Sequence, residues 1–521
     1  MKKLLLCVVS LAMACNSTQK TVPEPKATST AVVAPTAETY AATVTEEDLK
    51  KHLFTYASDE FEGRETGQPG QKKAIAYLKE HYQKLGVPAA KGGDDYFQKV
   101  PLELKNLPTG TVMIGGKEIV LGEHILSFRE AIGKVDQLVY VGYGIEEGTY
   151  SDYEGIDVKG KWVLMKGGEP MTADSTFTLS GTKEASKWSN ISEGPGLREE
   201  LANEKGVMGI IYFDEANFSR YKRYYDYMKT NDGGQMSFKS EESRAAMLVA
   251  DSEIATKLYA DISEDDTPKV IPITFDANLV AANTPVDTEN VAAIIKGSEK
   301  PEEYVIISSH LDHIGITADG QINNGADDDG SGSVALLEIA EAFKKAADAG
   351  NGPKRSIVFL HVTGEEKGLL GSQYYTDNDP IFPLAQTVAN LNIDMIGRID
   401  PKREGDRNYI YLIGSDKLST DLHELSEEVN EKYMNIELDY TYNDENDPNR
   451  FYYRSDHYNF AKNNIPIIFY FNGTHDDYHK PGDTPDKINY DLLENRTRLV
   501  FHTAWEVANR DARVIVDKAG K

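Results

Sequence analysis

The sequence predicts an α/β protein: a three-layer αβα sandwich around a central mixed, mostly parallel sheet, with a β-rich module inserted into it. Two observations support this. From Asn290 onward, wholly apolar runs typical of buried strands alternate with helical patterns. Between about Val100 and Ala282 the pattern changes to short β-type runs separated by glycines. A length of 521 residues also exceeds what one hydrophobic core usually supports, so two folded units are expected.

The first 43 residues precede the predicted folded part. A basic start, a short apolar stretch and small residues before Cys15 resemble a bacterial lipoprotein signal peptide, residues 1–15, with Cys15 as the lipidation site. Such signals normally have Leu three places before the cysteine, and here that place is Ala12, so cleavage by ordinary signal peptidase remains an alternative. Residues 16–43 are rich in Thr, Ala and Pro and predict a flexible tether. Both alternatives predict export, either to the cell envelope as a periplasmic or outer-membrane lipoprotein or as a secreted protein.

The predicted main domain begins with two helices. One opens near Glu46, and the other covers residues 70–85, where apolar residues recur at i, i+3 and i+4 spacing before Gly86. They flank the loop 62–67. We assign residues 44–100 and 283–521 to this domain and residues 101–282 to the insert.

The insert contains β-type runs at 137–144, 161–165 and 209–213. Its segments 141–145 (VGYGI), 155–161 (GIDVKGK) and 204–211 (EKGVMGII) resemble a protease-associated domain. In that family the domain carries no chemistry of its own, so the resemblance implies that any reaction takes place in the main domain.

The second part of the main domain holds the apolar strands. They are predicted at residues 304–308, 356–360, 388–396, 409–413 and 466–471, with a helix over 331–347. Polar residues follow the carboxyl ends of these strands, where α/β folds place their sites.

Composition restricts the function. The formal net charge of −28 would repel a polyanion, so we expect no nucleic-acid partner. No apolar run beyond the leader is long enough to span a bilayer, so a lipid anchor is the only membrane attachment expected. Both cysteines, Cys7 and Cys15, lie in the leader, so any metal in the folded part must be held by His, Asp and Glu.

Five segments can supply such ligands, each at a strand end or in a glycine-rich turn. A hydrolytic site with two zinc ions needs oxygen and nitrogen ligands, one carboxylate that bridges the ions, and a separate base. The segments are 309–313 (SHLDH), 324–332 (NGADDDGSG), 363–368 (TGEEKG), 392–397 (NIDMIG) and 477–481 (DYHKP).

Taken alone, several of these segments could have roles other than binding zinc. A single His is more often structural than a ligand, and two adjacent Glu residues are more often a solvated pair. A calcium loop is excluded for Asp327-Asp328-Asp329-Gly330, because with Gly330 at the sixth position Gly325 and Leu336 would stand where Asp and Glu are required. Asp394 follows an apolar run, where an unpaired carboxylate would be costly, and this favours ligation.

In order and spacing, the five segments resemble the co-catalytic dizinc aminopeptidase family, whose relatives include leucyl aminopeptidases, glutamate carboxypeptidase and the non-catalytic transferrin receptors. The resemblance covers roughly Thr43 to the C-terminus. It implies two Zn²⁺ ions and assigns a role to each matching position. The metal ligands are His310, Asp328 as the bridge, Glu366, Asp394 and His479; Glu365 is the general base, Tyr478 helps to hold the oxyanion, and Asp312 is the partner that orients His310. His361, His475 and the segment 455–457 are expected to be structural.

The predicted function is therefore a zinc-dependent exopeptidase acting on peptides, most simply an aminopeptidase. Two alternatives use the same scaffold: a carboxypeptidase or dipeptidase, and a glutaminyl cyclase with a single zinc. A third is a non-catalytic binding protein that kept the fold, and a fourth is a structural envelope component. All the ligand positions are present, which favours two metals and hydrolysis. The sequence indicates neither the side-chain preference nor the oligomeric state.

Overall fold

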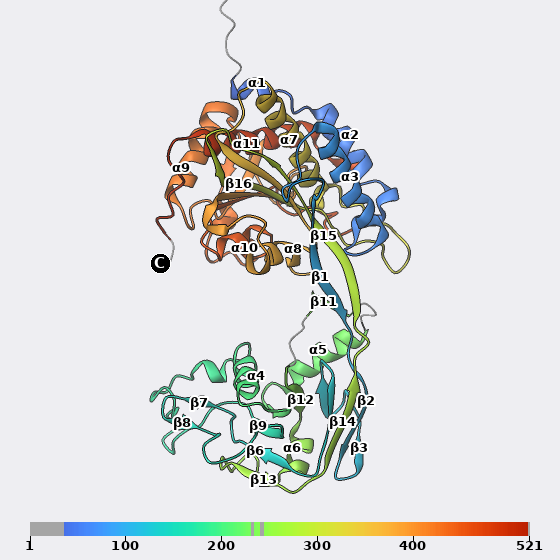
Figure 1. Cartoon of the computed structure of the whole chain (residues 1–521), viewed down its shortest axis with the longest axis vertical. Coiled ribbons are helices and arrows are strands. Elements are labelled where there is room, and N and C mark those ends of the chain that lie inside the picture. Colours follow the sequence, from blue (N-terminus) through green and yellow to red (C-terminus); the bar gives the residue numbers. More distant parts are fainter. Residues whose placement is uncertain (1–35, 231–233, 240–243, 519–521) are drawn as a thin grey trace, which may run out of the picture.

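The computed structural model describes residues 36–230, 234–239 and 244–518. They form two bodies joined by long strands (Figure 1). The predicted signal peptide, with Cys15, lies outside the described residues. No helix in the described part of the chain is long and apolar enough to cross a membrane.

The larger body is built on a nine-stranded mixed sheet in the order β11-β1-β15-β17-β16-β18-β21-β19-β20. Four central strands, β17, β16, β18 and β21, pair in parallel, and antiparallel pairings extend the sheet on both sides. The strands are β1 Phe97–Lys105, β11 Gln235–Phe238, β15 Thr284–Ile295, β16 Lys300–His310, β17 Arg355–Val362, β18 Thr387–Ile393, β19 Tyr409–Ile413, β20 Glu437–Asp439 and β21 Ile467–Phe471.

Helices cover both faces of this sheet, which confirms the predicted α/β class (Figure 1). On β16, Val305 and Ile307 join one apolar cluster, and Ile306 between them joins the cluster on the opposite face. Both faces of the strand are therefore buried, which explains its continuous apolar run. The helices are α1 Ala37–Ala41, α2 Glu46–Tyr56, α3 Pro69–Leu85, α7 Gly332–Asp348, α8 Leu370–Gln373, α9 Thr420–Val429, α10 His457–Ala461 and α11 Tyr490–Asn509.

The expected helix over residues 70–85 is α3, and its residues Ala74, Ile75, Leu78 and Tyr82 are buried as the periodicity predicts. The expected tether is wrong at its end, however. Residues 37–41 form α1, and Tyr40 stacks on Trp505 of α11 with ring centroids 5.8 Å apart. Residues 36–43 therefore belong to the folded body, because a few apolar side chains among small residues are enough to anchor a short helix on an existing core. Residues 16–35 lie outside the described part.

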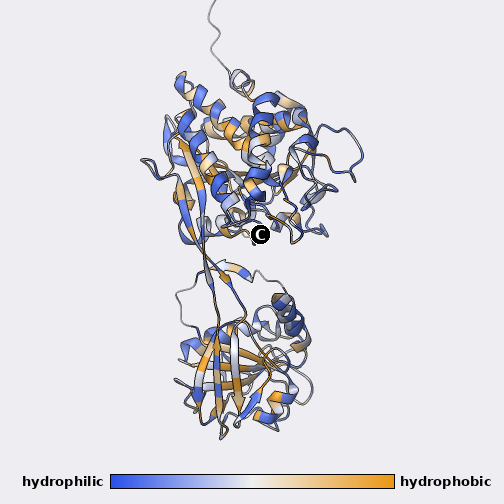
Figure 2. Cartoon of the chain, turned by 90° about the vertical axis from the view of Figure 1, so that its right-hand side faces the viewer, coloured by the Kyte–Doolittle hydropathy of each residue, from blue (hydrophilic) through white to orange (hydrophobic). Residues whose placement is uncertain are grey.

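The smaller body is the insert. Its six-stranded sheet has the order β13-β6-β9-β10-β12-β4, in which β6, β9, β10 and β12 are parallel, and an antiparallel four-stranded sheet, β3-β2-β14-β5, packs with it. Hydrophobic residues lie along its strands, as they do in the larger body (Figure 2). The elements are β2 Thr109–Ile114, β3 Lys117–Ile119, β4 Ile125–Ser127, β5 Ala131–Val135, β6 Leu138–Tyr140, β9 Trp162–Lys166, α4 Gly194–Glu204, β10 Gly209–Phe213, α5 Phe218–Thr230, β12 Ala246–Ala250, α6 Ser252–Leu258, β13 Lys269–Ile271 and β14 Phe275–Val280.

The antiparallel pair β1 and β15 leads from the larger body to the insert, with register from Phe97↔Val291 to Leu104↔Thr284. The insert thus leaves and re-enters the main sheet through neighbouring strands. This keeps the main sheet continuous although its sequence is interrupted.

Candidate metal centre

Three neighbouring parallel strands deliver polar residues to one edge of the main sheet. His310 is the last residue of β16, Asp394 directly follows β18, and Glu365 and Glu366 follow β17 by a short turn. Because the carboxyl ends of parallel strands meet at the same edge, residues far apart in the sequence come together there.

Two groups of three side chains place ligand atoms within 4.8 Å of one another: His310 with Asp328 and Asp394, and His313 with Asp328 and Glu366. In the first group, His310 Nε2 lies 3.2 Å from Asp328 Oδ1 and 3.5 Å from Asp394 Oδ1. These separations suit nitrogen and oxygen atoms bound to one ion at about 2.0–2.2 Å.

The predicted ligand His479 completes the second group. Its Nε2 lies 3.1 Å from Asp328 Oδ2 and 3.2 Å from Glu366 Oε2. The two oxygens of Asp328 therefore face different groups of ligands, as a bridging carboxylate requires.

The loop before α7 explains why Asp328, and not its neighbours, points into the cluster. Asp327 Oδ1 accepts a hydrogen bond from Gly397 N at 2.7 Å. Asp329 Oδ1 accepts from Gly332 N at 2.9 Å and from Met395 N at 3.1 Å. A side chain at Gly332 would collide with the Asp329 carboxylate at 2.4 Å, so glycine is needed there. The outer two carboxylates thus hold the loop, and the middle one remains for the cluster.

The cluster fits a metal because it is buried and incompletely paired. His310 Nε2 and Asp328 Oδ2 are buried and have no hydrogen-bond partner among the described residues. Buried polar atoms are nearly always satisfied, so such atoms within a group of ligand-type side chains fit a bound cation.

The close contacts between ligand side chains also shift their pKa values. Burial opposes the charge on His479, but its contacts with Asp328 and Glu366 outweigh burial and raise its pKa to about 10. Burial and the charge of Asp328 act to raise the pKa of Glu366, yet the hydrogen bonds from His313 and His479 lower it to about 2. The carboxylates thus favour a proton on His479, and metal binding at this residue should release that proton.

Glu365 lies beside the cluster in a different state. Burial, followed by the nearby charges of Glu366 and Asp394, raises its pKa well above the ordinary value, although His310 acts in the opposite direction. A carboxyl group with a raised pKa can accept a proton and give it back, which suits it to acid–base catalysis.

Tyr478 and Glu365 line one pocket with Asp328, Asp394 and His479. Burial and the surrounding carboxylates raise the pKa of Tyr478, so its hydroxyl stays protonated and can donate a hydrogen bond. Its ring stacks on that of His479 with centroids 3.9 Å apart.

Asp312 contacts His310 through its backbone, because His310 Nδ1 lies 3.0 Å from the Asp312 carbonyl oxygen. Among the described residues, no hydrogen bond or ion pair joins the Asp312 carboxylate to the imidazole. That carboxylate instead accepts hydrogen bonds from Thr66 Oγ1 at 2.7 Å and from the amide of Glu365 at 3.1 Å. It is turned toward the loop before α3 and the turn after β17 because Thr66 and Glu365 there supply its donors, and it therefore positions Glu365.

The sequence analysis missed His313. Its side chain is fully buried, and its Nδ1 lies 2.9 Å from Glu366 Oε1. A Cβ at Gly325 would lie 2.5 Å from the His313 ring, so the glycine makes room for the ring. The available signal was a second His in the segment 309–313, at a strand end that already carried a predicted ligand.

The histidines expected to be structural make ordinary contacts. His361 bonds to Tyr82 at 2.7 Å, and His457 bonds to the backbone of Tyr452 at 2.8 Å. His475 is buried beside Asp327, with Nε2 3.2 Å from Asp327 Oδ2.

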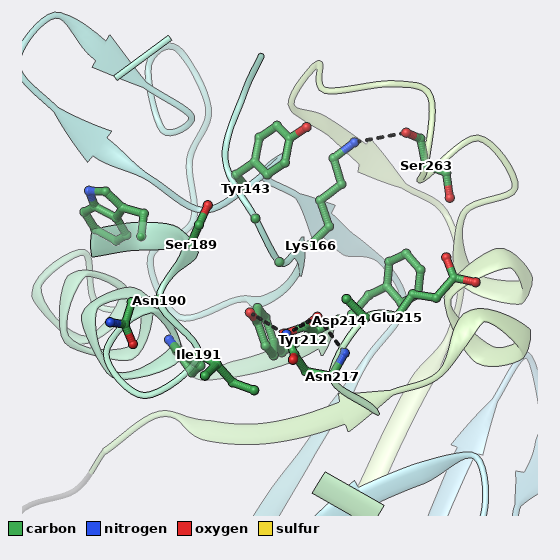
Figure 3. A pocket seen from close by; sticks show the side chains of 16 residues that line it. Tyr143, Lys166, Ser189, Asn190, Ile191, Tyr212, Asp214, Glu215, Asn217 and Ser263 are labelled. Carbon is green, nitrogen blue, oxygen red and sulfur yellow. Dashed lines mark hydrogen bonds between the residues drawn. The ribbon is translucent and has the colours of Figure 1, made fainter. Parts of the chain in front are cut away.

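A second cavity, of about 540 Å³, lies in the insert at the carboxyl ends of β9 and β10 (Figure 3). Two of its charged groups already have partners in the chain. Lys166 Nζ pairs with Asp266 at 2.6 Å, and both oxygens of Asp214 accept hydrogen bonds from Asn217. The arrangement does not require a metal or a reactive group.

The fold and the cluster together describe an α/β domain with buried His, Asp and Glu side chains that could hold a metal ion at one edge of its sheet. Residues 290–504 match the model of Peptidase family M28, and this range contains all the cluster residues. The domain that carries the metal centre therefore belongs to peptidase family M28.

Individual relatives have the following similarity. Probable leucine aminopeptidase 2 of Aspergillus oryzae (strain ATCC 42149 / RIB 40) is 23% identical over 478 residues, 87% of this chain and 81% of the relative. Probable glutamate carboxypeptidase LAMP1 of Arabidopsis thaliana is 32% identical over 152 residues, 28% of this chain and only 21% of the relative. The solved structure of an aminopeptidase from Aneurinibacillus sp. strain AM-1 is 20% identical, with a TM-score of 0.47, over 92% of this chain and 98% of that one.

Proposed function

We propose that the protein is a zinc-dependent exopeptidase, an aminopeptidase, that hydrolyses N-terminal residues from peptides at a site with two zinc ions. The supporting observation is that the Asp328 oxygens face two separate ligand groups. The peptidase family of the domain and the aminopeptidase name of its Aspergillus relative agree with this proposal.

His310, Asp328 and Asp394 would hold one ion, and Asp328, Glu366 and His479 the other. Bound there, zinc ions would lower the pKa of water and polarise the peptide carbonyl. Glu365 takes a proton from the attacking water and passes it to the leaving amine. Tyr478, protonated and in the same pocket, donates a hydrogen bond to the oxygen that becomes negative. Asp312 holds the backbone of Glu365 for this transfer.

Carboxypeptidase action is the alternative, because the Arabidopsis relative carries that name. Aminopeptidase action is favoured because the Aspergillus relative, which carries the aminopeptidase name, matches 87% of this chain, whereas the Arabidopsis relative matches 28%.

We also propose that the protein is exported and attached to the cell envelope through a lipid on Cys15, with peptides as its substrates. The support is the N-terminal pattern of basic, apolar and small residues before Cys15. Metabolic labelling with a radioactive fatty acid tests this: label on the wild type and none on Cys15→Ser is expected, and label on neither would disprove the anchor.

The enzymatic proposal is tested by metal content together with activity on free-amine and N-acetylated aminoacyl and dipeptide substrates, before and after chelation. Two zinc ions per chain and chelator-sensitive cleavage of free-amine substrates alone are expected. Cleavage that ignores the N-terminus would indicate a carboxypeptidase or an endopeptidase instead. Absence of both metal and turnover would make the chain a non-catalytic relative.

A further inference from the structure

One cation lines the metal-centre pocket, and the proposed chemistry does not use it. Arg454 lies in the pocket wall with Asp328, Glu365 and Tyr478. Its side chain is exposed, so it is available to a ligand in the pocket.

Arg454 has no carboxylate within ion-pair distance among the residues that the structure describes. Its guanidinium instead lies over the ring of Phe451, 4.9 Å from the centroid. A guanidinium that stacks on a ring contacts it with its planar face. Its N–H groups point outward in the guanidinium plane and can bind a planar acceptor.

The backbone under Arg454 is held by the next three residues, which are buried. Ser455 Oγ accepts a hydrogen bond from Asn392 at 2.9 Å, Asp456 Oδ1 accepts one from Ser372 at 2.5 Å, and His457 bonds to Tyr452. The segment 455–457, which stood out in the sequence without a chemical role, thus anchors Arg454 at the pocket.

One part of the pocket wall is apolar. Beside Arg454 it is formed by Met395, Phe451, Phe469 and Phe471. Water is partly excluded by such a wall, so an ion pair formed there is stronger than one on an open surface. A guanidinium with a free N–H edge matches a carboxylate, which it can bind through two hydrogen bonds.

We propose that Arg454 binds a carboxylate of the peptide substrate beside the scissile bond and so sets a preference for acidic or very short peptides. The inference rests on the proposed peptidase function and adds a substrate class to it. The carboxylate is either the side chain of an acidic N-terminal residue or the free C-terminus of a dipeptide.

The test is kcat/KM of the zinc-loaded, full-length protein on two matched substrate pairs. Leucyl-glycine against leucyl-glycinamide reports on the C-terminal carboxylate. Glutamyl-alaninamide against glutaminyl-alaninamide reports on the side chain. The variants are Arg454→Met, Arg454→Lys and the matched control Arg450→Met, since Arg450 stacks on Tyr453 at the same 4.9 Å but does not line the pocket.

We expect the wild type to prefer the charged member of at least one pair by about tenfold, and Arg454→Met to reduce that ratio to about one. Arg454→Lys should retain part of the preference for the charged member. The control Arg450→Met should retain all of it and change turnover of the uncharged member by less than about twofold. The pair that responds identifies the source of the carboxylate. A ratio that survives in Arg454→Met, or a wild type without preference in either pair, overturns the inference.

Failure of the proposed function would look different, because no substrate would be turned over at all. In that case the same pairs are measured by calorimetric binding to Glu365→Gln, with and without Arg454→Met. Tighter binding of the charged member that disappears in the double variant supports the role of Arg454, and equal binding of both members disproves it.

Discussion

Both bodies of this protein place polar residues at the ends of parallel strands. In the larger body some atoms of these residues lack hydrogen-bond partners within the described part of the chain, and in the insert two of the charged residues are paired. In each body, neighbouring parallel strands carry polar residues at their carboxyl ends: β16, β17 and β18 in the main sheet, and β6, β9 and β10 in the insert. In the main sheet, ligand atoms of His310 and Asp328 are buried without hydrogen-bond partners. In the insert, Lys166 and Asp214 are paired with groups of the same chain.

The comparison shows that the larger cavity of a protein is not always the one lined by ligand-type residues. The cavity of the insert measures about 540 Å³, whereas the pocket at the metal cluster measures about 30 Å³. A site that binds a cation must keep its acceptors free of internal donors, at a cost in stability that only the ligand recovers. Among the described residues, His310 Nε2 of the cluster has no hydrogen-bond partner, whereas Lys166 and Asp214 at the cavity of the insert are paired within the chain.

The strongest test of this comparison is Glu365→Gln. We expect turnover to fall at least about 10³-fold, because the amide cannot accept the proton, while both metal ions stay bound. Asp328→Ala is the contrasting variant and should lose metal as well as activity. Steady-state kinetics and metal analysis of the purified variants measure both effects. Full activity of Glu365→Gln would mean that another group is the base.

A smaller effect is expected from substitution of His313, which lies in one group of ligand atoms with Asp328 and Glu366. His313→Ala removes the contact with Glu366, so the affinity for zinc should fall by about 10- to 100-fold. His313→Asn keeps an N–H near the position of Nδ1 and should recover part of the affinity. Competition with a chromogenic chelator measures the dissociation constants. Unchanged affinity in His313→Ala would make this histidine a packing residue.

The smallest effect is expected in the insert. Lys166→Met removes the ion pair with Asp266 at the cavity, and we expect kcat/KM to change by less than about twofold. The peptidase assay used for Glu365→Gln measures this directly. A large loss of turnover with normal metal content would instead show that the insert takes part in catalysis.

Much of the fold was predictable because the strands are buried on both faces. The apolar runs at 304–308, 356–360 and 409–413 are the strands β16, β17 and β19, and the helix at 331–347 is α7. The short helix α1 was not predicted, because its Thr- and Ala-rich sequence forms a helix only when Tyr40 can pack on Trp505.

The sequence by itself determined which ligand types are present and at which positions. A carboxylate or imidazole buried at the end of a strand lowers stability unless it is paired or binds a ligand, so such positions stand out. Only the tertiary structure decided which atoms meet. Asp312 contacts Thr66 across 246 residues, His313 meets Glu366 across 53, and Arg454 shares a pocket wall with Glu365. Such contacts depend on the order and register of strands in the sheet, which local patterns of polarity do not encode.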